Sequence, residues 1–415
     1  MDGPAAGFAT SRPPAAPDPA PASQPGNRPG PTAGASAGGP RTVLHVFGVL
    51  DRGGAELRTL EVVQGLAGEP VRFLVCTLTG RAGGLAERYR KAEVQVVPLA
   101  LRSPAFALRF VRLLRRERVD VVHSHVLFGS GVVLAVAALA GVGERIAHFR
   151  SDGSAHTQPS PLRRLRYALL RRLILLTATQ VLGVAPGTLD ANWGTGWHED
   201  RRFSVLPSGV ELDVYRGPAG PLRRELALPP GAALVLHLGR ADIATKNRGL
   251  AVRVVAEARR RGADVHLVFV GRDGRDTADA RTNRDVLARL AETEGAAAAV
   301  HFLGERSDVP GLLAAADLLL STSSREGLPG VLLEAAASGV PVVSSDVPGA
   351  RFIADEVPGI SIVRLADDVS TWADTTLATL AGPGRDELLA ADALRGSIFD
   401  LDTCLERYRR LWRVR

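Results

Sequence analysis

The sequence predicts an α/β protein with two Rossmann-like, parallel-sheet domains that face a cleft. Three observations support this prediction. Strand-like runs rich in Val, Ile and Leu alternate with helical patterns from residue 42 to residue 365. The runs are continuously apolar, which is typical of parallel strands covered by helices on both faces. The chain has 415 residues, and that length suffices for two domains with separate cores.

Strands are expected in both halves of the chain. Those of the first half lie at residues 42–50, 71–78, 94–99, 119–125, 145–150, 178–184 and 202–207. Those of the second half lie at residues 234–240, 265–271, 299–304, 317–322, 340–345 and 360–365. The two sets join near residues 208–216. Because ligands of such folds bind at the carboxyl ends of the strands, functional residues are expected directly after them.

Composition divides the chain further. Residues 1–40 hold ten prolines and seven glycines and almost no large apolar side chain. Such a segment cannot bury enough apolar surface to offset the loss of conformational entropy on ordering. We therefore expect a disordered tail. Residues 41–207 and 208–399 are expected to form the two domains, and 400–415 an amphipathic helix. We expect Asp400 to cap this helix rather than to bind a metal.

Charge and cysteine content narrow the functional class. The net charge is +7, and only two of the 51 basic residues are lysines, Lys91 and Lys246. The two cysteines, Cys76 and Cys404, fall in a strand and a helix pattern, as expected for a reduced, cytoplasmic protein. Aromatic residues make up 5% and no binding motif is present, which excludes nucleic acid as the expected partner. No uncharged stretch is long enough to favour a membrane span.

The most informative segment is EGLPGVLLE at residues 326–334. A strand-like run precedes it and an apolar helix follows. The first backbone N–H groups of such a helix have no partner inside it and can bind phosphate. Glu326 and Glu334 bracket the turn, where one can hold a sugar hydroxyl and the other a ribose. Spacing alone leaves an alternative, an ordinary βαβ unit with one acid at the helix dipole and another on a solvated face.

The longer segment EGLPGVLLEAAASGVPVV at 326–343 resembles the Glu-x7-Glu signature of the family-4 retaining glycosyltransferases, which have the GT-B fold. The resemblance implies transfer of a sugar, with retention, from a nucleotide-diphosphate donor, a UDP- or GDP-sugar. It implies a glycan, lipid-linked or small-molecule acceptor, and neither cofactor nor metal. It also implies that the helix at 400–415 crosses back to the first domain. Two alternatives share the scaffold: a GT-B sugar-nucleotide epimerase, and a catalytically silent protein that binds sugar nucleotides.

The donor-site residues implied by the resemblance lie mostly just after predicted strands. They are Gly53, Gly54, Arg240, Lys246, Arg306, Val309, Glu326, Gly327, Leu328, Pro329, Gly330 and Glu334. Arg240 and Lys246 would hold the diphosphate, since a guanidinium and an ammonium suit it. Glu326 would bind the donor sugar and Glu334 the ribose.

Two further parts of this site rest on backbone atoms. The loop with Gly53 and Gly54 permits close approach of the main chain to a ligand, although tight βα turns often use Gly-Gly for geometry alone. Arg306 and Val309 fall where the family binds the nucleotide base, often through main-chain atoms, so side-chain identity says little.

The run VDVVHSH places His123 and His125 on one face of a strand. A zinc pair is conceivable, but no third ligand with suitable spacing is near, so we expect no metal site. The resemblance sets His125 against the donor sugar, beside Glu326, Arg240 and Lys246 as the catalytic set, and leaves His123 packed.

The acceptor side is expected at the end of the next strand. His148, Arg150 and Asp152 follow one another there at every second residue. The resemblance directs them to the acceptor space, and ordinary structural roles are an equal alternative.

Two stretches combine arginines with large apolar residues, at 108–119 and 162–176. On helices they give faces that suit an anionic membrane surface or a lipid-linked acceptor. The alternative is a solvated cationic face in an arginine-rich protein. The expected location is accordingly the cytoplasm, either free or at the inner face of the membrane.

Overall fold

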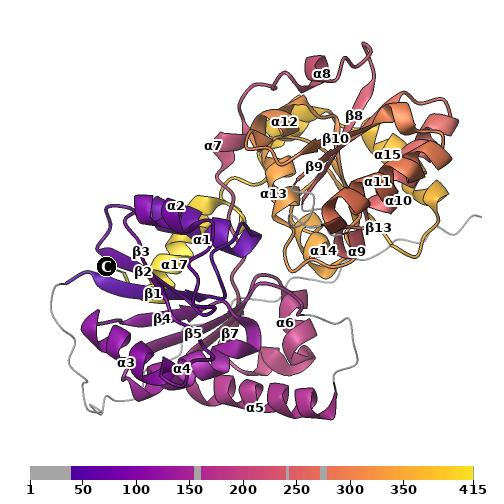
Figure 1. Ribbon diagram of the computed structural model, residues 1–415. Coiled ribbons are helices and arrows are strands. Elements are labelled where there is room, and N and C mark those ends of the chain that lie inside the picture. Colours follow the sequence, from indigo (N-terminus) through magenta and orange to yellow (C-terminus); the bar gives the residue numbers. More distant parts are fainter. Residues whose placement is uncertain (1–38, 154–159, 240–242, 272–277, 415) are drawn as a thin grey trace, which may run out of the picture. The chain divides into compact units, whose positions relative to one another are not determined.

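A computed structural model describes residues 39–153, 160–239, 243–271 and 278–414 (Figure 1). The predicted tail, 1–40, lies almost wholly outside these residues. Residues Pro40–Arg415 form one compact unit, and this unit contains two parallel sheets.

The first sheet has seven strands in the order β3-β2-β1-β4-β5-β6-β7. Its strands are β1 (Arg41–Phe47), β2 (Val71–Thr77), β3 (Gln95–Pro98), β4 (Val121–Ser124), β5 (Glu144–Phe149), β6 (Gln180–Gly183) and β7 (Phe203–Val205). Its helices are α1 (Gly54–Gly65), α2 (Ala86–Lys91), α3 (Phe106–Arg116), α4 (Ser130–Leu139), α5 (Pro161–Thr177) and α6 (Pro186–Trp193).

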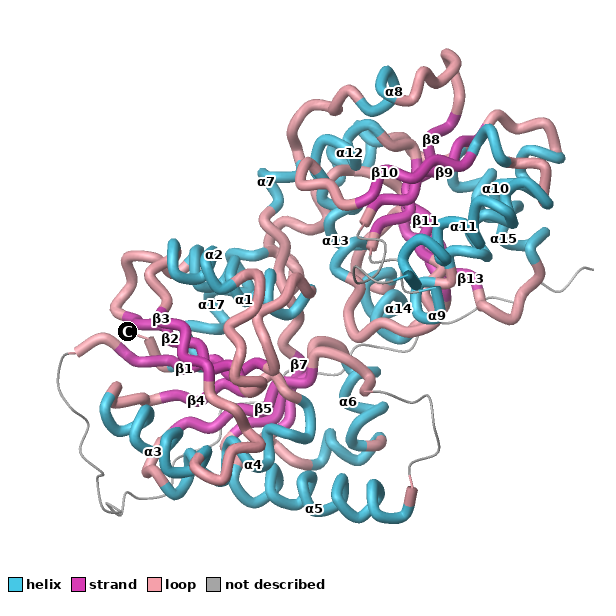
Figure 2. Tube along the Cα trace, in the orientation of Figure 1, coloured by secondary structure: helices cyan, strands magenta, loops and turns pink. Residues whose placement is uncertain are grey.

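The second sheet has six strands in the order β10-β9-β8-β11-β12-β13 (Figure 2). Its strands are β8 (Ala233–Leu238), β9 (Val265–Val270), β10 (Val300–Gly304), β11 (Leu318–Ser321), β12 (Val342–Ser345) and β13 (Ile360–Val363). The helices that accompany it are α7 (Leu212–Tyr215), α8 (Leu222–Glu225), α9 (Ile243–Lys246), α10 (Arg248–Arg260), α11 (Ala278–Thr293), α12 (Val309–Ala315), α13 (Gly330–Ala337), α14 (Pro348–Ala354), α15 (Val369–Leu380) and α16 (Arg385–Ala391). The last helix is α17 (Leu401–Trp412).

Both faces of each sheet are covered, which explains the continuously apolar strands. In β1, Val43 and Phe47 belong to one core cluster and Leu44 and Val46 to another. Successive side chains of a strand point to opposite faces, so a strand between two helix layers must be apolar on both. All the predicted strands are present, and within the described residues they are mostly shorter at their ends than the apolar runs. The predicted α/β fold is confirmed.

Two segments run side by side between the sheets. Val210 and Asp400 form a parallel bridge, with hydrogen bonds of 2.9 Å from Val210 N to Phe399 O and 3.1 Å from Leu401 N to Val210 O. A Cβ on Gly209 would lie 2.7 Å from Leu401 Cα, so only glycine permits this approach. The Asp400 carboxylate accepts a hydrogen bond of 3.2 Å from Asp402 N, which confirms the predicted cap of α17.

Helix α17 packs on the first sheet. Its Tyr408 and Trp412 belong to the same buried cluster as Val43 of β1, and Arg409 pairs with Glu69 at 2.6 Å. Cys404, in the same cluster, and Cys76 in β2 are free and buried. Of the helices in the part of the chain that the structure describes, none combines the length and the apolar composition needed to cross a bilayer.

Candidate functional site

The turn between β11 and α13 is the centre of the candidate site, and a glycine sets its position. A Cβ on Gly327 would lie 2.5 Å from Arg150 O and 3.0 Å from Ser151 Cα. Only glycine therefore allows this turn of the second sheet to reach the segment that follows β5 of the first. Thr188 of α6 donates to Gly327 O at 3.3 Å, which fixes the contact. Leu328 packs against the second core, and Pro329 occupies the N-cap position of α13.

Glu326 lies at this turn and is held by two side chains. Its Oε1 accepts hydrogen bonds from Lys246 Nζ and, at 2.9 Å, from Ser323 Oγ. The lysine and glutamate side chains are 19% and 18% exposed. A Cβ on Gly239 would lie 2.9 Å from Lys246 Cε, and the φ of this glycine is +134°, so the path of the lysine depends on it. The structure thus joins two of the predicted catalytic residues.

Thr322 supports the lysine from behind. Its hydroxyl lies 3.0 Å from the carbonyl oxygens of both Lys246 and Asn247, and 3.2 Å from His237 Nε2. Burial, with the nearby charges of Arg248 and Lys246, lowers the pKa of His237 to about 3. The imidazole is therefore neutral, and its N–H can donate to the threonine oxygen while the hydroxyl donates to a carbonyl.

Glu334 lies on α13 and pairs with a residue that was not predicted from the sequence. Arg58 of α1 donates to Glu334, and to Glu61 at 2.7 Å. Arg58 is only 8% exposed, and its Nη2 lies 3.5 Å from the Cβ position of Gly330, at the start of α13. Burial opposes the charge of Arg58, yet Glu334 and Glu61 leave its pKa raised. Tyr215 adjoins the pair.

The ion pair between Arg58 and Glu334 also affects the pKa of the glutamate. Burial raises the pKa of Glu334, and the Arg58 guanidinium opposes that rise. One signal in the sequence points to Arg58: it lies four residues after Gly54, one turn into the helix that opens at the glycine loop.

The glycine loop before α1 has two different glycines. Gly53 is the N-cap of α1, and a Cβ there would collide with the Glu56 carboxylate. Gly54 is exposed, and nothing lies within 4 Å of its Cβ position. A side chain at Gly53 would thus displace the Glu56 carboxylate, whereas Gly54 leaves space in which a ligand can approach the backbone.

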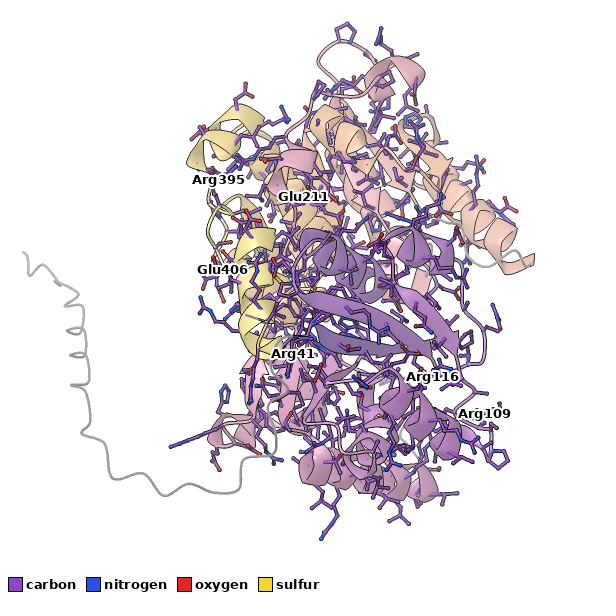
Figure 3. All side chains as sticks on the ribbon, turned by 90° about the vertical axis from the view of Figure 1, so that its left-hand side faces the viewer. Arg41, Arg109, Arg116, Glu211, Arg395 and Glu406 are labelled. Atoms are coloured by element: carbon purple, nitrogen blue, oxygen red, sulfur yellow. The ribbon has the colours of Figure 1, made fainter. Side chains whose placement is uncertain are left out.

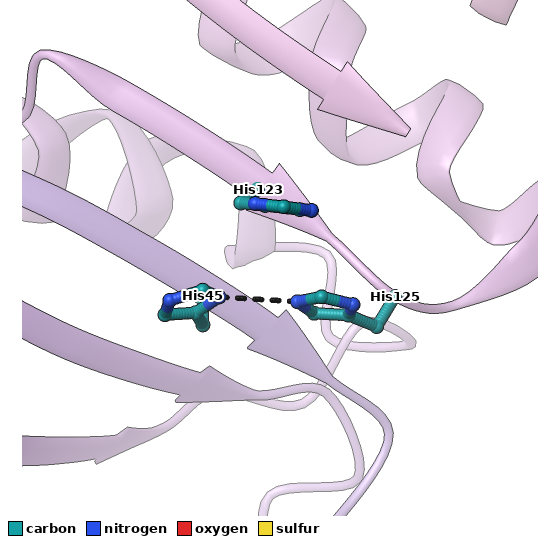
Figure 4. Close-up of side chains that lie close together, drawn as sticks. All are labelled: His45, His123 and His125. Atoms are coloured by element: carbon teal, nitrogen blue, oxygen red, sulfur yellow. Dashed lines mark hydrogen bonds between the residues drawn. The ribbon is translucent and has the colours of Figure 1, made fainter. Parts of the chain in front are cut away.

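His125 belongs to a cluster of imidazoles from neighbouring strands (Figure 4). His125 Nε2 lies 3.1 Å from His45 Nδ1, and His123 Nε2 lies 3.1 Å from His148 Nδ1. The ring nitrogens of His45, His123 and His125 lie within 4.8 Å of one another. The expectation that no third imidazole is near was wrong, because His45 and His123 are partners across adjacent strands, a proximity that spacing along the chain does not reveal.

These imidazoles nevertheless do not fit a metal ion. Trp412 Nε1 donates to His123 Nδ1 at 3.2 Å, and Arg150 Nε donates to His125 Nδ1 at 3.4 Å. Each of the two rings then carries its proton on Nε2, which donates to the next imidazole. The lone pairs that a metal needs are thus already accepting hydrogen bonds. The rings of His123 and His125 are also stacked, 4.5 Å apart at 17°, so an ion in one ring plane lies outside the other.

The cluster is uncharged. Burial is the first cause that lowers the pKa of each of these four histidines, with the Arg150 charge adding to it. Because both ring nitrogens of His125 are engaged by the protein, they do not face a ligand. Its role beside the donor sugar stays a prediction.

The three residues expected on the acceptor side differ in position. His148 is 1% exposed, so the prediction that it faces the acceptor was wrong: its ring is buried against His123 in the imidazole cluster. Arg150 donates to Ser208 at 2.9 Å, Tyr408 at 3.3 Å and Thr59 at 3.4 Å, and so joins several elements. Asp152 is half-buried, and its Oδ1 has no hydrogen-bond partner among the described residues.

Asp152 lies near the 326–330 turn. Burial raises the pKa of Asp152; Arg325 opposes that rise and Glu326 adds to it. The aspartate is therefore the member of the predicted acceptor group that the structure brings to Glu326.

The remaining donor-site predictions are Arg306, Val309 and Arg240. Arg306 pairs with Asp308 at 2.6 Å and with Glu225 at 3.1 Å. Its guanidinium is therefore already paired with two carboxylates. Val309 begins α12 and packs against the second core. Arg240 lies outside the described residues.

Known proteins match both sheet regions. The family described as Glycosyltransferase Family 4 matches residues 52–214, and the family described as Glycosyl transferases group 1 matches residues 232–381. The capsular polysaccharide biosynthesis glycosyltransferase CapH of Staphylococcus aureus is 26% identical over 306 residues, which are 74% of this chain and 81% of CapH. The D-inositol 3-phosphate glycosyltransferase of Xylanimonas cellulosilytica is 34% identical over 207 residues, 47% of each chain.

Among solved structures, that of HepE from Anabaena in complex with UDP has a TM-score of 0.74 at 18% identity and covers 89% of this chain and 98% of HepE. This likeness concerns the fold. Membership of a transferase family favours glycosyl transfer over the epimerase and over the silent binding protein. With one family match on each of its two sheets, the chain belongs to the family-4 glycosyltransferases of GT-B fold.

Proposed function

We propose that this glycosyltransferase moves a hexose, with retention of configuration, from a nucleotide-diphosphate sugar to an acceptor hydroxyl and needs no metal. One observation carries the proposal: Glu326 is held by Lys246 and Ser323 at the turn that opens α13. This arrangement sets a carboxylate for sugar hydroxyls directly beside an ammonium for phosphate, at a helix N-terminus that favours anions.

The charges around the turn suit the leaving diphosphate. As the bond between the sugar C1 and the phosphate oxygen lengthens, negative charge grows on that oxygen. Lys246, Arg58 and the first N–H groups of α13 would stabilise this charge, because fixed donors aimed at a developing charge lower the barrier most. These groups supply the positive charge that a divalent ion supplies in other transferases.

Bond changes at C1 complete the reaction. The C1–phosphate bond breaks, the acceptor oxygen bonds to C1 on the same face, and the acceptor proton passes to the departing phosphate oxygen. Glu326 would hold the sugar hydroxyls through this step. Asp152, with one carboxylate oxygen unpartnered beside Glu326, would accept a hydrogen bond from an acceptor hydroxyl and orient it.

Glu334 would bind the ribose of the donor. Its carboxylate is paired with Arg58, and the guanidinium lies over Gly330 at the start of α13. A bound donor would therefore set its ribose against Glu334 and its phosphates near Arg58, so that one pair serves both parts of the nucleotide.

Relatives indicate which substrates to test. HepE was solved with UDP and with UDP-glucose, which supports a UDP-sugar as the first donor and a GDP-sugar as the second. The part that CapH has in capsular polysaccharide biosynthesis favours a growing glycan as acceptor, free or lipid-linked, over a small molecule. No cofactor beyond the donor is proposed.

A thermal-shift panel of UDP-, GDP- and ADP-sugars tests the donor. A ligand at a hundred times its Kd stabilises the folded state by about 2.7 kcal/mol. One nucleotide series should raise Tm, and Glu334→Gln should reduce that rise. No shift with any sugar nucleotide would refute the proposal. The matched control is Glu406→Gln, an exposed acid on α17 (Figure 3).

A further inference from the structure

The outer face of α5 is unusually apolar for an exposed helix. Five of the ten exposed large apolar side chains in the described residues belong to α5. Leu162, Leu165, Leu169 and Leu176 are 78%, 68%, 58% and 69% exposed. Their spacing of three, four and seven residues puts them within about 60° of one another around the helix. Among the residues of α5, only Ile174 is fully buried.

Packing leaves the leucine stripe, which consists of Leu162, Leu165, Leu169 and Leu176, on the outside of the domain. A Cβ on Gly131 of α4 would lie 2.5 Å from Leu170 O and 3.2 Å from Leu173 Cβ, so α5 rests on α4 through Leu170 and Leu173. Tyr167 also faces inward, 5.6 Å from Phe128 between ring centroids. The stripe itself therefore contributes little to the core of the first sheet.

Positive charge accompanies the stripe. The segment PLRRLRYALLRRLILLT has five arginines and no acidic residue. Arg166 and Arg172 are exposed and lie on the leucine side of the helical wheel. Helix α4 lies between α5 and α3, and α3 adds Arg109 and Arg116 at the edge of the same domain (Figure 3). A cationic rim around exposed leucines suits a surface that is anionic outside and apolar beneath.

We propose that the outer face of α5 docks on an anionic lipid bilayer, with the leucine stripe in the acyl boundary and the arginines among the headgroups. The helix would lie in the plane of the interface. Its 17 residues span about 25 Å, and the four exposed leucines are distributed along this length. The docking is independent of the donor chemistry.

Vesicle co-sedimentation of the full chain tests this proposal. Wild-type protein should bind vesicles of phosphatidylcholine with phosphatidylglycerol, bind phosphatidylcholine alone weakly, and dissociate as salt is raised, because salt screens headgroup charge. The variant with Leu165→Ser and Leu169→Ser should bind at least about tenfold more weakly, since buried apolar area sets the affinity. The matched control, Val286→Ser with Leu365→Ser, changes exposed apolar residues of the second sheet domain.

A charge variant separates the two contributions. Arg166→Glu with Arg172→Glu should abolish the preference for anionic vesicles, whereas Arg410→Glu on α17, 80% exposed, should not. Equal binding by wild type and the leucine variant, or no binding by wild type, would overturn the proposal. Dimers that the leucine variant loses, without vesicle binding by wild type, would instead assign the face to a second copy of the chain.

Discussion

Replacing Arg58 by methionine should destabilise the protein by about 2–3 kcal/mol. Methionine keeps much of the side-chain volume and removes the charge. Breaking a buried ion pair costs about 3–5 kcal/mol, because the remaining charge stays buried without its partner. The Arg58 side chain is 9% exposed and that of Glu334 is 22% exposed. Water reaches the glutamate, so we expect the lower part of that range, reduced further for screening.

A double-mutant cycle isolates the pair. Glu334→Gln alone leaves Arg58 bonded to Glu61 at 2.7 Å and should cost less than Arg58→Met. In the double variant neither member of the pair is charged, and Glu61, which also loses its arginine, does so equally in Arg58→Met alone. The coupling energy between the two substitutions should be about 1–2 kcal/mol, a size found for residues in direct contact. Urea unfolding of the four proteins measures it.

The pH dependence gives a second check. Burial raises the pKa of folded Glu334, so its proton is bound more tightly in the folded than in the unfolded chain. Such a group stabilises the fold below its unfolded pKa, and this stability is lost as pH rises through the folded pKa. Arg58→Met removes the opposing charge and raises the folded pKa further. The free energy of unfolding that Arg58→Met loses relative to wild type should therefore be largest at neutral and alkaline pH and smaller at acid pH. A deficit that is constant with pH, together with zero coupling, would show that the pair does not form.

Three further outcomes are expected. Lys246→Ala should lose about 2–4 kcal/mol of transition-state stabilisation with little change in folding stability. Single-turnover rates measure the first effect and urea unfolding the second. An unchanged rate would remove Lys246 from the site. Glu326→Gln should lower turnover with little change in donor affinity, whereas Glu334→Gln should mainly weaken donor binding, by about 1–3 kcal/mol. Calorimetry measures donor affinity and initial rates measure turnover. Identical behaviour of the two variants would refute the division of roles. Turnover should survive EDTA, since Lys246 and the start of α13 supply the charge that a metal would; loss restored by manganese would contradict this.

The fold was predictable because its signal lies along the chain. Continuous apolar runs arise whenever helices cover both faces of a sheet, and β1 shows this directly, with Val43 and Leu44 in different cores. The resemblance at 326–343 likewise rests on consecutive residues. The rule that ligands bind at the carboxyl ends of parallel strands placed Glu326 and Lys246 in one site, but their direct pairing is seen only in the structure.

What was missed depends on contacts between distant residues. Arg58 meets Glu334 across 276 positions, and no periodicity reports which residue of one helix faces which of another. His45 meets His125 across 80 positions, because strand order decides which imidazoles are neighbours. His148 was predicted wrongly for a different reason. A polar residue at a strand end suggests a functional site whether its side chain is buried or exposed, and the sequence does not report which.

The position of α17 has a consequence for biosynthesis. The first sheet domain leaves the ribosome before the second, yet Trp412 and Tyr408, which lie in its core with Val43, are translated after the second sheet domain. Until then the nascent first domain lacks the indole that donates to His123 and exposes the apolar surface that α17 will cover. Such transiently exposed surface makes a chain prone to aggregation. Maturation of the first domain therefore waits until α17 has been translated, and the nascent chain presents a surface of the kind that chaperones bind.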